Sequence, residues 1–314
     1  MPRRPGARAR IEPAALPRVW LARDRPSEVI SANLRAGRWE RTSRGVYTAV
    51  PTTADESPFA AAERRALAQI AGIDRRLTST HWFSHVSAAL IWGLPVWRVP
   101  TTTHILATRA AGSTRAPTVT THTGRLVDED LVEASGLPVT SLGRTVADCL
   151  ATLPPLDGLV IADGALHRGL DPDELEAAVH ARTARNGSAR ARAVMSVADG
   201  GAESPGESAT RYVVVRDGFP LPTTQIPVVT HLGEYWSDLG WEEWLLLMEY
   251  DGELKYTSRA DLVDEKRRHD ALVETGRRVL RVTRRDLTGL TARLLPHVPD
   301  SIRRSLRPRR ELFG

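Results

Sequence analysis

The hydrophobic pattern divides the last third of the chain into six consecutive elements. A Ser-Pro pair opens a helix over about 206–217, and an apolar run at 245–248 between turn residues indicates a buried strand. Residues 222–230 are rich in β-branched residues and include Pro227, which predicts a strand that is either at an edge of the sheet or bulged. Residues 259–275 have helical spacing and end at a glycine, and residues 278–283 alternate with a period of two. The predicted order is helix, three strands, helix, strand.

Three carboxylates flank the apolar run: Asp238 before it, and Glu249 and Asp251 at its end. Side chains alternate along a strand, so Glu249 and Asp251 are expected to share a face with Leu247. Buried carboxylates need a positive partner, and a divalent cation accepts several oxygen ligands at one point. Mg²⁺ or Mn²⁺ bound there would polarise a phosphoryl oxygen and activate water. The alternative is that Asp251 only caps a turn and that Asp238 lies in a hairpin loop.

The predicted order and three local patterns resemble the PD-(D/E)XK nuclease superfamily, in particular its very-short-patch-repair-like endonucleases. The patterns are Gly206-Glu207-Ser208 with Arg211; Asp238 followed by Glu249-Tyr250-Asp251-Gly252; and Glu265 with Arg268 and Leu272 before Gly276 to Arg281. The resemblance implies a metal-dependent DNA endonuclease with an αβββαβ core. It also implies that Asp238 and Glu249 bind the metal and that Glu207 is the acid of the first helix.

One position departs from the superfamily motif, which has a lysine two residues after the second acid. This chain has Asp251 there, as the repair-like branch commonly has an acid. The chain contains only two lysines, Lys255 and Lys266, against 41 arginines. Lysine is a compact charge whose pKa can shift, whereas arginine stays charged. We therefore expect Lys255 to supply the missing positive charge, with chance survival of both lysines as the alternative.

A helix followed by a basic hairpin is predicted near the N-terminus. Residues 26–37 form the helix, with Ser27 as its N-cap, and residues 39–48 give a strand, an Arg-Gly turn and a strand. This order is typical of a winged helix-turn-helix, and a winged helix used only for protein contacts is the alternative. The arginines expected to contact DNA phosphates here are Arg38, Arg41 and Arg44.

Three segments of the first 170 residues resemble AbiEi-type antitoxins of type IV toxin–antitoxin systems. They are Arg38 to Tyr47, Ser84 to Pro95, and Val139 to Asp148. The resemblance implies a cognate toxin of the nucleotidyltransferase type as a partner. His81 and His85 are four residues apart, but we interpret them as packed or capping side chains because no third ligand follows. Arg144 and Asp148 have the spacing of a helical ion pair.

Charge and cysteine content favour a cytoplasmic protein that binds nucleic acid. The 314 residues carry a net charge of +5, arginines crowd both ends, and acids gather between 234 and 253. Basic flanks around an acidic pocket suit a metal nuclease, with Arg211 and Arg268 as further DNA contacts, although a charge run is often only a solvated face. The single cysteine, Cys149, is expected in the core, and we identify no leader or membrane-spanning segment.

Together these patterns predict an α/β (α+β multidomain) protein of three parts. Residues 1–55 form a basic tail and winged helix, 56–199 a mixed antitoxin-like middle domain with a helical connector, and 200–314 the PD-(D/E)XK-like domain with a basic tail. The predicted function is a metal-dependent DNA endonuclease or DNA-processing phosphodiesterase in phage defence or repair. The alternative is a non-enzymatic type IV antitoxin or transcriptional regulator with an inactive nuclease-like fold.

Overall fold

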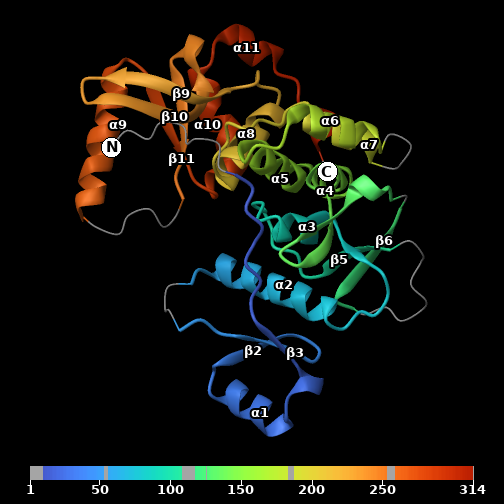
Figure 1. The fold of residues 1–314 in the computed structure, drawn as a ribbon. Coiled ribbons are helices and arrows are strands. Elements are labelled where there is room, and N and C mark those ends of the chain that lie inside the picture. Colours follow the sequence, from blue (N-terminus) through green and yellow to red (C-terminus); the bar gives the residue numbers. More distant parts are fainter. Residues whose placement is uncertain are drawn as a thin grey trace. The chain divides into compact units, whose positions relative to one another are not determined.

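The computed structural model describes residues 10–52, 56–107, 117–124, 126–182, 187–252 and 259–313 (Figure 1). The chain divides into an N-terminal unit, Ile11–Cys149, and a C-terminal unit that begins at Leu150. Helices and three mixed or antiparallel sheets make it an α/β multidomain protein, as the sequence predicted. The border between the units falls inside the middle domain that the sequence predicted for residues 56–199.

The N-terminal unit begins with a three-stranded sheet in the order β1-β3-β2. Its elements are β1 (Val19–Leu21), α1 (Ser27–Arg35), β2 (Trp39–Ser43), β3 (Val46–Ala49) and α2 (Pro58–Asp74). The predicted helix and hairpin are both present, and the turn glycine, Gly45, has a φ of 74° that favours glycine. Ser27 is the first helical residue and not the N-cap, which is Pro26.

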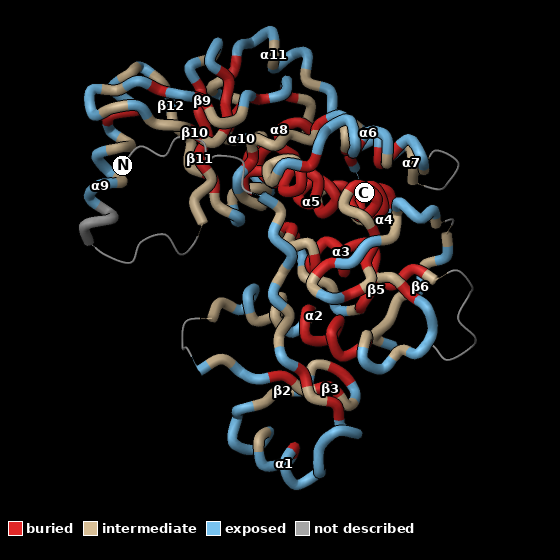
Figure 2. The backbone as a smooth tube through the Cα atoms, viewed as in Figure 1, coloured by how far each residue is buried: buried red, intermediate tan, exposed pale blue. Residues whose placement is uncertain are grey.

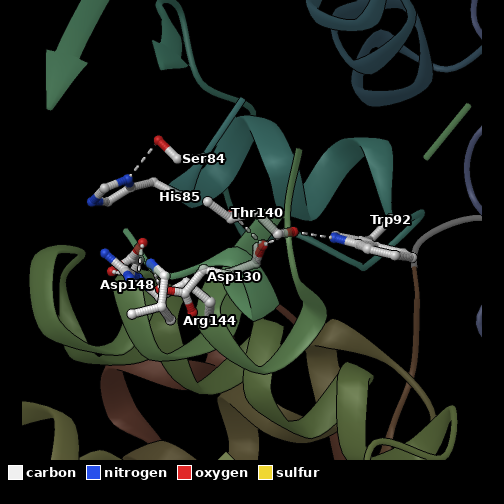
Figure 3. A network of polar contacts seen from close by, with 9 residues as sticks. Ser84, His85, Trp92, Asp130, Thr140, Arg144 and Asp148 are labelled. Carbon is white, nitrogen blue, oxygen red and sulfur yellow. Dashed lines mark hydrogen bonds and ion pairs between the residues drawn. The ribbon is translucent and has the colours of Figure 1, made fainter. Parts of the chain in front are cut away.

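A five-stranded sheet in the order β6-β5-β4-β8-β7 forms the rest of this unit. Its elements are β4 (Trp82–Phe83), α3 (His85–Ile91), β5 (Thr103–Ala107), β6 (Val119–Thr123), β7 (Leu131–Ala134), β8 (Leu137–Thr140) and α4 (Leu142–Thr152). Phe83 pairs with Val139, and the indole N–H of Trp92 donates to the Thr140 carbonyl at 3.0 Å (Figure 3). Two segments that carry the antitoxin resemblance therefore lie side by side.

The C-terminal unit combines a helical part with a four-stranded sheet in the order β12-β11-β10-β9. Its helices are α5 (Pro155–His167), α6 (Pro172–His180), α7 (Ser188–Met195), α8 (Pro205–Arg216), α9 (Arg259–Glu274), α10 (Leu290–Leu294) and α11 (Asp300–Ser305). Its strands are β9 (Thr223–Thr230), β10 (Gly233–Trp241), β11 (Leu246–Tyr250) and β12 (Arg278–Val282). From α8 to β12 this is the predicted order of six elements. Strand β9, which contains Pro227, lies at the edge of the sheet, one of the two predicted alternatives.

Strand β11 is covered by a helix on each face. Leu247 packs in one cluster with Leu272 of α9. Tyr250, three residues further along the strand, lies against Gly206 of α8. A Cβ atom at Gly206 would be only 2.0 Å from Cε1 of Tyr250, so glycine is required for this approach. Since alternate residues of a strand point to opposite faces, α8 and α9 cover opposite sides of the sheet.

A buried ion pair joins α5 to α8 within the C-terminal unit. The Arg211 guanidinium is 1% exposed and bonds to the Asp163 carboxylate and to the Val197 carbonyl. The other carboxylate oxygen of Asp163 accepts the N–H of Asp199 at 2.8 Å. An uncompensated charge at this depth would be costly, so Asp163 and Arg211 each require the opposite charge of the other.

Burial differs greatly from one helix to another (Figure 2). All residues of α3 are buried, and most of α5 is buried, whereas only Ile30 of α1 is buried. The thiol of Cys149 is fully buried, as the sequence predicted, and burial raises its pKa. No helix in the described part of the chain combines the length and the apolar character needed to cross a membrane.

Replacing Asp163 by alanine should lower the free energy of unfolding by about 3–5 kcal/mol, because it leaves Arg211 buried without a carboxylate. Urea denaturation followed by circular dichroism measures the loss. The control Asp300→Ala, which removes an exposed pair with Arg303, should change stability far less. The double variant Asp163→Leu, Arg211→Met should recover most of the stability. Equal effects of Asp163→Ala and Asp300→Ala would contradict this account.

The Gly206→Ala variant should lose about 1–3 kcal/mol of stability, because its methyl group overlaps the Tyr250 ring. Gly289→Ala is the matched control, since a Cβ there meets no atom within 4 Å. Thermal unfolding of both variants tests the contact. A Gly206→Ala protein as stable as the control would show that the Tyr250 ring can move aside freely.

Candidate functional site

Asp238 and Glu249 lie on two paired strands, each one residue beyond the last paired position. The antiparallel register joins Gly240 to Leu247 and Leu239 to Met248 and ends there. The charges of both carboxylates act on Arg268 of α9. Asp238 Oδ2 accepts the backbone N–H of Tyr250 at 2.7 Å, which ties the carboxylate to β11. Asp238 is therefore part of a strand and not of a hairpin loop.

Arg268 of α9 contacts Oε1 of Glu249, whose side chain is almost fully buried. Burial alone would lower the pKa of Arg268, but the carboxylates of Glu249, Glu265 and Asp238 more than offset this and raise it. Arg268 is therefore held as a permanent cation in front of these acids. The structure directs it toward the acidic residues, whereas the sequence suggested a role in contacting DNA.

Four acids form a network with two arginines, and we call Asp238, Glu249, Asp251 and Glu265 the acidic cluster. Glu265 bonds to Arg281 at 2.6 Å and lies 3.8 Å from Arg268. Arg281 also lies 3.9 Å from Asp251. Each of these arginines contacts Glu265 on α9 and a carboxylate at or just after the end of β11.

The donor set of the acidic cluster fits a hard divalent cation. Only Oε1 of Glu249 is used by Arg268, and its Oε2 has no partner among the residues that the structure describes. Carboxylate oxygens are the ligands that Mg²⁺ and Mn²⁺ prefer. Asp238 and Glu249 could therefore hold such an ion while Arg268 keeps its contact with Glu249.

Glu207 lies in the first turn of α8, where Ser204 caps the helix by accepting the Glu207 N–H at 3.2 Å. Its Oε2 accepts the N–H of Glu203 at 2.8 Å and faces the Gln225 amide at 3.5 Å. Helix α8 covers the face of the sheet opposite to α9. Within the described residues, Glu207 does not form a group with Asp238 and Glu249 in which all ligand atoms lie within 4.8 Å.

The arginines predicted to bind DNA fall into two environments. Arg38, Arg41 and Arg44 are exposed on and beside the hairpin of β2 and β3. Arg211, in contrast, is buried in its ion pair with Asp163, so the structure corrects the prediction that it contacts DNA. Lys255 belongs to residues 253–258, which lie outside the described part of the chain.

A cavity of about 620 Å³ lies in the C-terminal unit beside the residues that bind Glu207. Glu203 and Gln225, which both contact Glu207, line it together with Asp199 and His167. Neither Glu207 nor any member of the acidic cluster lines this cavity. The cavity is therefore lined by neither of the proposed metal ligands, Asp238 and Glu249.

The ion pair predicted between Arg144 and Asp148 is present, at 3.0 Å, and is much more buried than a surface helix pair (Figure 3). Asp148 is fully buried, and Asp130 adds a second carboxylate at 2.7 Å from Arg144. Asp130 ends the 3-10 turn directly before β7, so this arginine joins α4 to the edge of the five-stranded sheet. A spacing of four residues predicted the first contact but not the second.

Sequence reasoning missed a group of three histidines in the N-terminal unit. His81 bonds to the Ser79 carbonyl at 2.8 Å and does not join His85. His85 instead meets His104 of β5 and His122 of β6, with one potential ligand atom of each ring within 4.8 Å of the others. Burial lowers the pKa of His104, which favours its neutral, metal-binding form. The three residues are far apart in sequence, so no local spacing could have revealed the group.

Comparisons with known proteins bear on the family of the chain. No protein-family model matches it. A solved structure of the RV2827C protein from Mycobacterium tuberculosis covers 57% of this chain and 72% of that chain, with 16% identity and a TM-score of 0.35, too low to indicate a shared fold. The uncharacterized proteins MT2308 and Rv2248 of Mycobacterium tuberculosis are each 31% identical over 188 residues, which is 58% of this chain and 69% of theirs. The chain belongs to the same family as MT2308 and Rv2248.

Proposed function

We propose that the C-terminal unit is a metal-dependent DNA endonuclease or DNA-processing phosphodiesterase of the PD-(D/E)XK type. The observation that carries this proposal is the presence of Asp238 and Glu249 on the paired strands β10 and β11, both acting on Arg268, within the αβββαβ segment from α8 to β12. The acidic cluster that contains these two residues gathers four carboxylates, with which Arg268 and Arg281 interact. A buried strand that ends in carboxylates is suited to a cation.

Each residue of the site has a distinct proposed role. Asp238 and Oε2 of Glu249 would hold Mg²⁺ or Mn²⁺, which when bound would polarise the phosphate and lower the pKa of a water molecule. Arg268 holds Glu249 in place through Oε1 and contributes positive charge near a bound phosphate. Asp251 lies beside Arg281 at the end of β11 and Glu207 at the start of α8, and we assign both to support of the site.

The N-terminal unit is the proposed DNA-targeting part. Arg38, Arg41 and Arg44 lie on one short segment, are exposed, and can approach phosphates without breaking a buried ion pair. Phosphate contacts bind duplex DNA of any sequence and make binding sensitive to salt. The proposed setting is phage defence or repair in the cytoplasm.

A second candidate is a non-enzymatic type IV antitoxin or transcriptional regulator. It is favoured by the direct contact between Arg268 and Glu249, because a guanidinium already compensates one of the two proposed metal ligands. In that case the same fold would bind DNA or a nucleotidyltransferase-type toxin without hydrolysing phosphodiester bonds. Metal-dependent cleavage separates the two candidates.

Incubation of the full chain with supercoiled plasmid and Mg²⁺ or Mn²⁺ should convert the plasmid to nicked or linear DNA. Asp238→Asn and Glu249→Gln should each lower the rate at least about 100-fold, a loss of about 2.7 kcal/mol in transition-state stabilisation, because each removes a metal-ligand charge. Gel electrophoresis over time measures the rate.

Asp270→Asn is the matched control, since Asp270 is an exposed acid of α9 outside the acidic cluster. It should cleave at the wild-type rate. Wild-type protein that binds DNA but cleaves none with either metal would leave the antitoxin or regulator as the better account. Cleavage that survives both active-site substitutions would instead indicate a contaminating nuclease or another site.

Binding of duplex DNA should fall steeply as salt increases, and Arg38→Gln, Arg41→Gln and Arg44→Gln should each weaken it on all sequences alike. Loss of one phosphate contact reduces the slope of log affinity against log salt by about 1. Fluorescence anisotropy at several salt concentrations measures both effects. Arg190→Gln, an exposed arginine of α7, is the control and should leave the slope unchanged. Identical slopes for all four variants would assign the hairpin to protein contacts.

A further inference from the structure

Three histidines from separate elements of the N-terminal unit converge at one side of its five-stranded sheet. His104 lies on β5 and His122 on the neighbouring strand β6, which runs parallel to it. His104 pairs with Thr120 in the register, so His104, Thr120 and His122 share one face. His85 begins α3, directly after β4 on the other side of β5.

The backbone holds His85 in place beside β5. Ser84 N–H donates to the His104 carbonyl at 3.1 Å, and His104 N–H donates to Ser87 Oγ at 2.8 Å, so the first turn of α3 is bonded to β5 on both sides of His85. His85 has a φ of 53°, which is uncommon for a residue other than glycine. Such strain persists only where the surroundings determine the conformation, and it is frequent at ligand-binding positions.

The ring nitrogens are close enough to share one ion. His104 Nδ1 and His122 Nε2 are 3.0 Å apart, and the ligand atoms of all three rings lie within 4.8 Å of one another. Two imidazole nitrogens bound to one tetrahedral zinc at about 2.0–2.1 Å lie about 3.3 Å apart. The rings of His85 and His122 stack at 3.6 Å, an arrangement that suits neutral imidazoles better than two cations. Small side-chain movements would bring three nitrogens to metal-binding distance.

Two of the rings have a second partner of the kind that orients a metal ligand. His85 Nδ1 faces Ser84 Oγ at 3.0 Å (Figure 3). His104 Nε2 faces Thr102 Oγ1 at 3.4 Å, and Thr102 Oγ1 accepts from Thr120 Oγ1 at 3.2 Å. Metal-bound histidines commonly donate their other N–H in this way, which fixes the tautomer and the ring direction.

We propose that His85, His104 and His122 form a binding site for one Zn²⁺ ion. Three neutral imidazoles are ligands of borderline softness that suit zinc, whereas Mg²⁺ prefers oxygen. Three protein ligands leave a fourth position for water or for a donor atom of a substrate, as in catalytic zinc sites. Within the described residues this is the one group of three or more histidine, cysteine or acidic side chains with such spacing. The site is independent of the acidic cluster and of the proposed nuclease.

The test uses the full chain after removal of metals by a chelator. Equilibrium dialysis against Zn²⁺ in the presence of excess Mg²⁺ should retain one zinc per chain. Co²⁺, used as a spectroscopic probe, should give the intense visible bands of four-coordinate cobalt with nitrogen ligands. His104→Gln, His122→Gln and His85→Asn should each weaken binding at least about tenfold, which is about 1.4 kcal/mol. Asparagine is chosen at position 85 because it tolerates a positive φ.

His81→Gln and Asp238→Asn are the controls, and both should keep the zinc stoichiometry and the cobalt spectrum. His81 is a neighbouring histidine outside the group, and Asp238 belongs to the acidic cluster. Circular dichroism of each variant checks that it is folded. The cobalt spectrum of the wild-type protein tests the proposal even where a variant fails to fold. Absence of zinc retention, an octahedral cobalt spectrum, or binding lost in Asp238→Asn but kept in the histidine variants would each overturn the proposal.

Discussion

Strand β11 must be buried on both faces and yet end in carboxylates, and the C-terminal unit is organised around this constraint. Leu247 faces α9 and Tyr250 faces α8, so neither face of the strand is open to water where it carries Glu249. A buried carboxylate needs compensation in place of water. The structure supplies it with Arg268 from α9. The packing of α9 against this face of the sheet is what brings the guanidinium to Glu249.

Arginine is the cation that compensates buried acid throughout the described residues. Arg211 pairs with Asp163, Arg144 with Asp148 and Asp130, and Arg268 with Glu249. Guanidinium is planar, weakly hydrated and always charged, so it can satisfy two oxygens at once in a buried position. The first two networks join secondary-structure elements and have a structural role. The acidic cluster differs because its carboxylates gather around the end of one buried strand.

The two units therefore offer ligands of different chemistry. The C-terminal sheet presents carboxylate oxygens at the end of a buried strand, which is the environment that Mg²⁺ and Mn²⁺ prefer. The N-terminal sheet presents three imidazoles fixed by strand pairing and by the first turn of α3, which is the environment that Zn²⁺ prefers. A single chain that holds both kinds of donor set can discriminate between the metals through ligand type alone.

Periodicity and turn chemistry in the sequence determined the elements, and tertiary pairing decided the sites. The helix begun at Ser204, the edge strand with Pro227, the buried strand before Glu249 and the Arg-Gly hairpin are local signals, and the structure contains all of them. The alternation along β11 also predicted that Glu249 shares a face with Leu247. Local signals carry no information about which distant side chain meets which. For this reason only the tertiary structure shows three of the contacts: Arg211 buried against Asp163, Arg268 on Glu249, and His85 beside His104 and His122. Sheet order and helix packing join these residues across up to 48 positions of sequence.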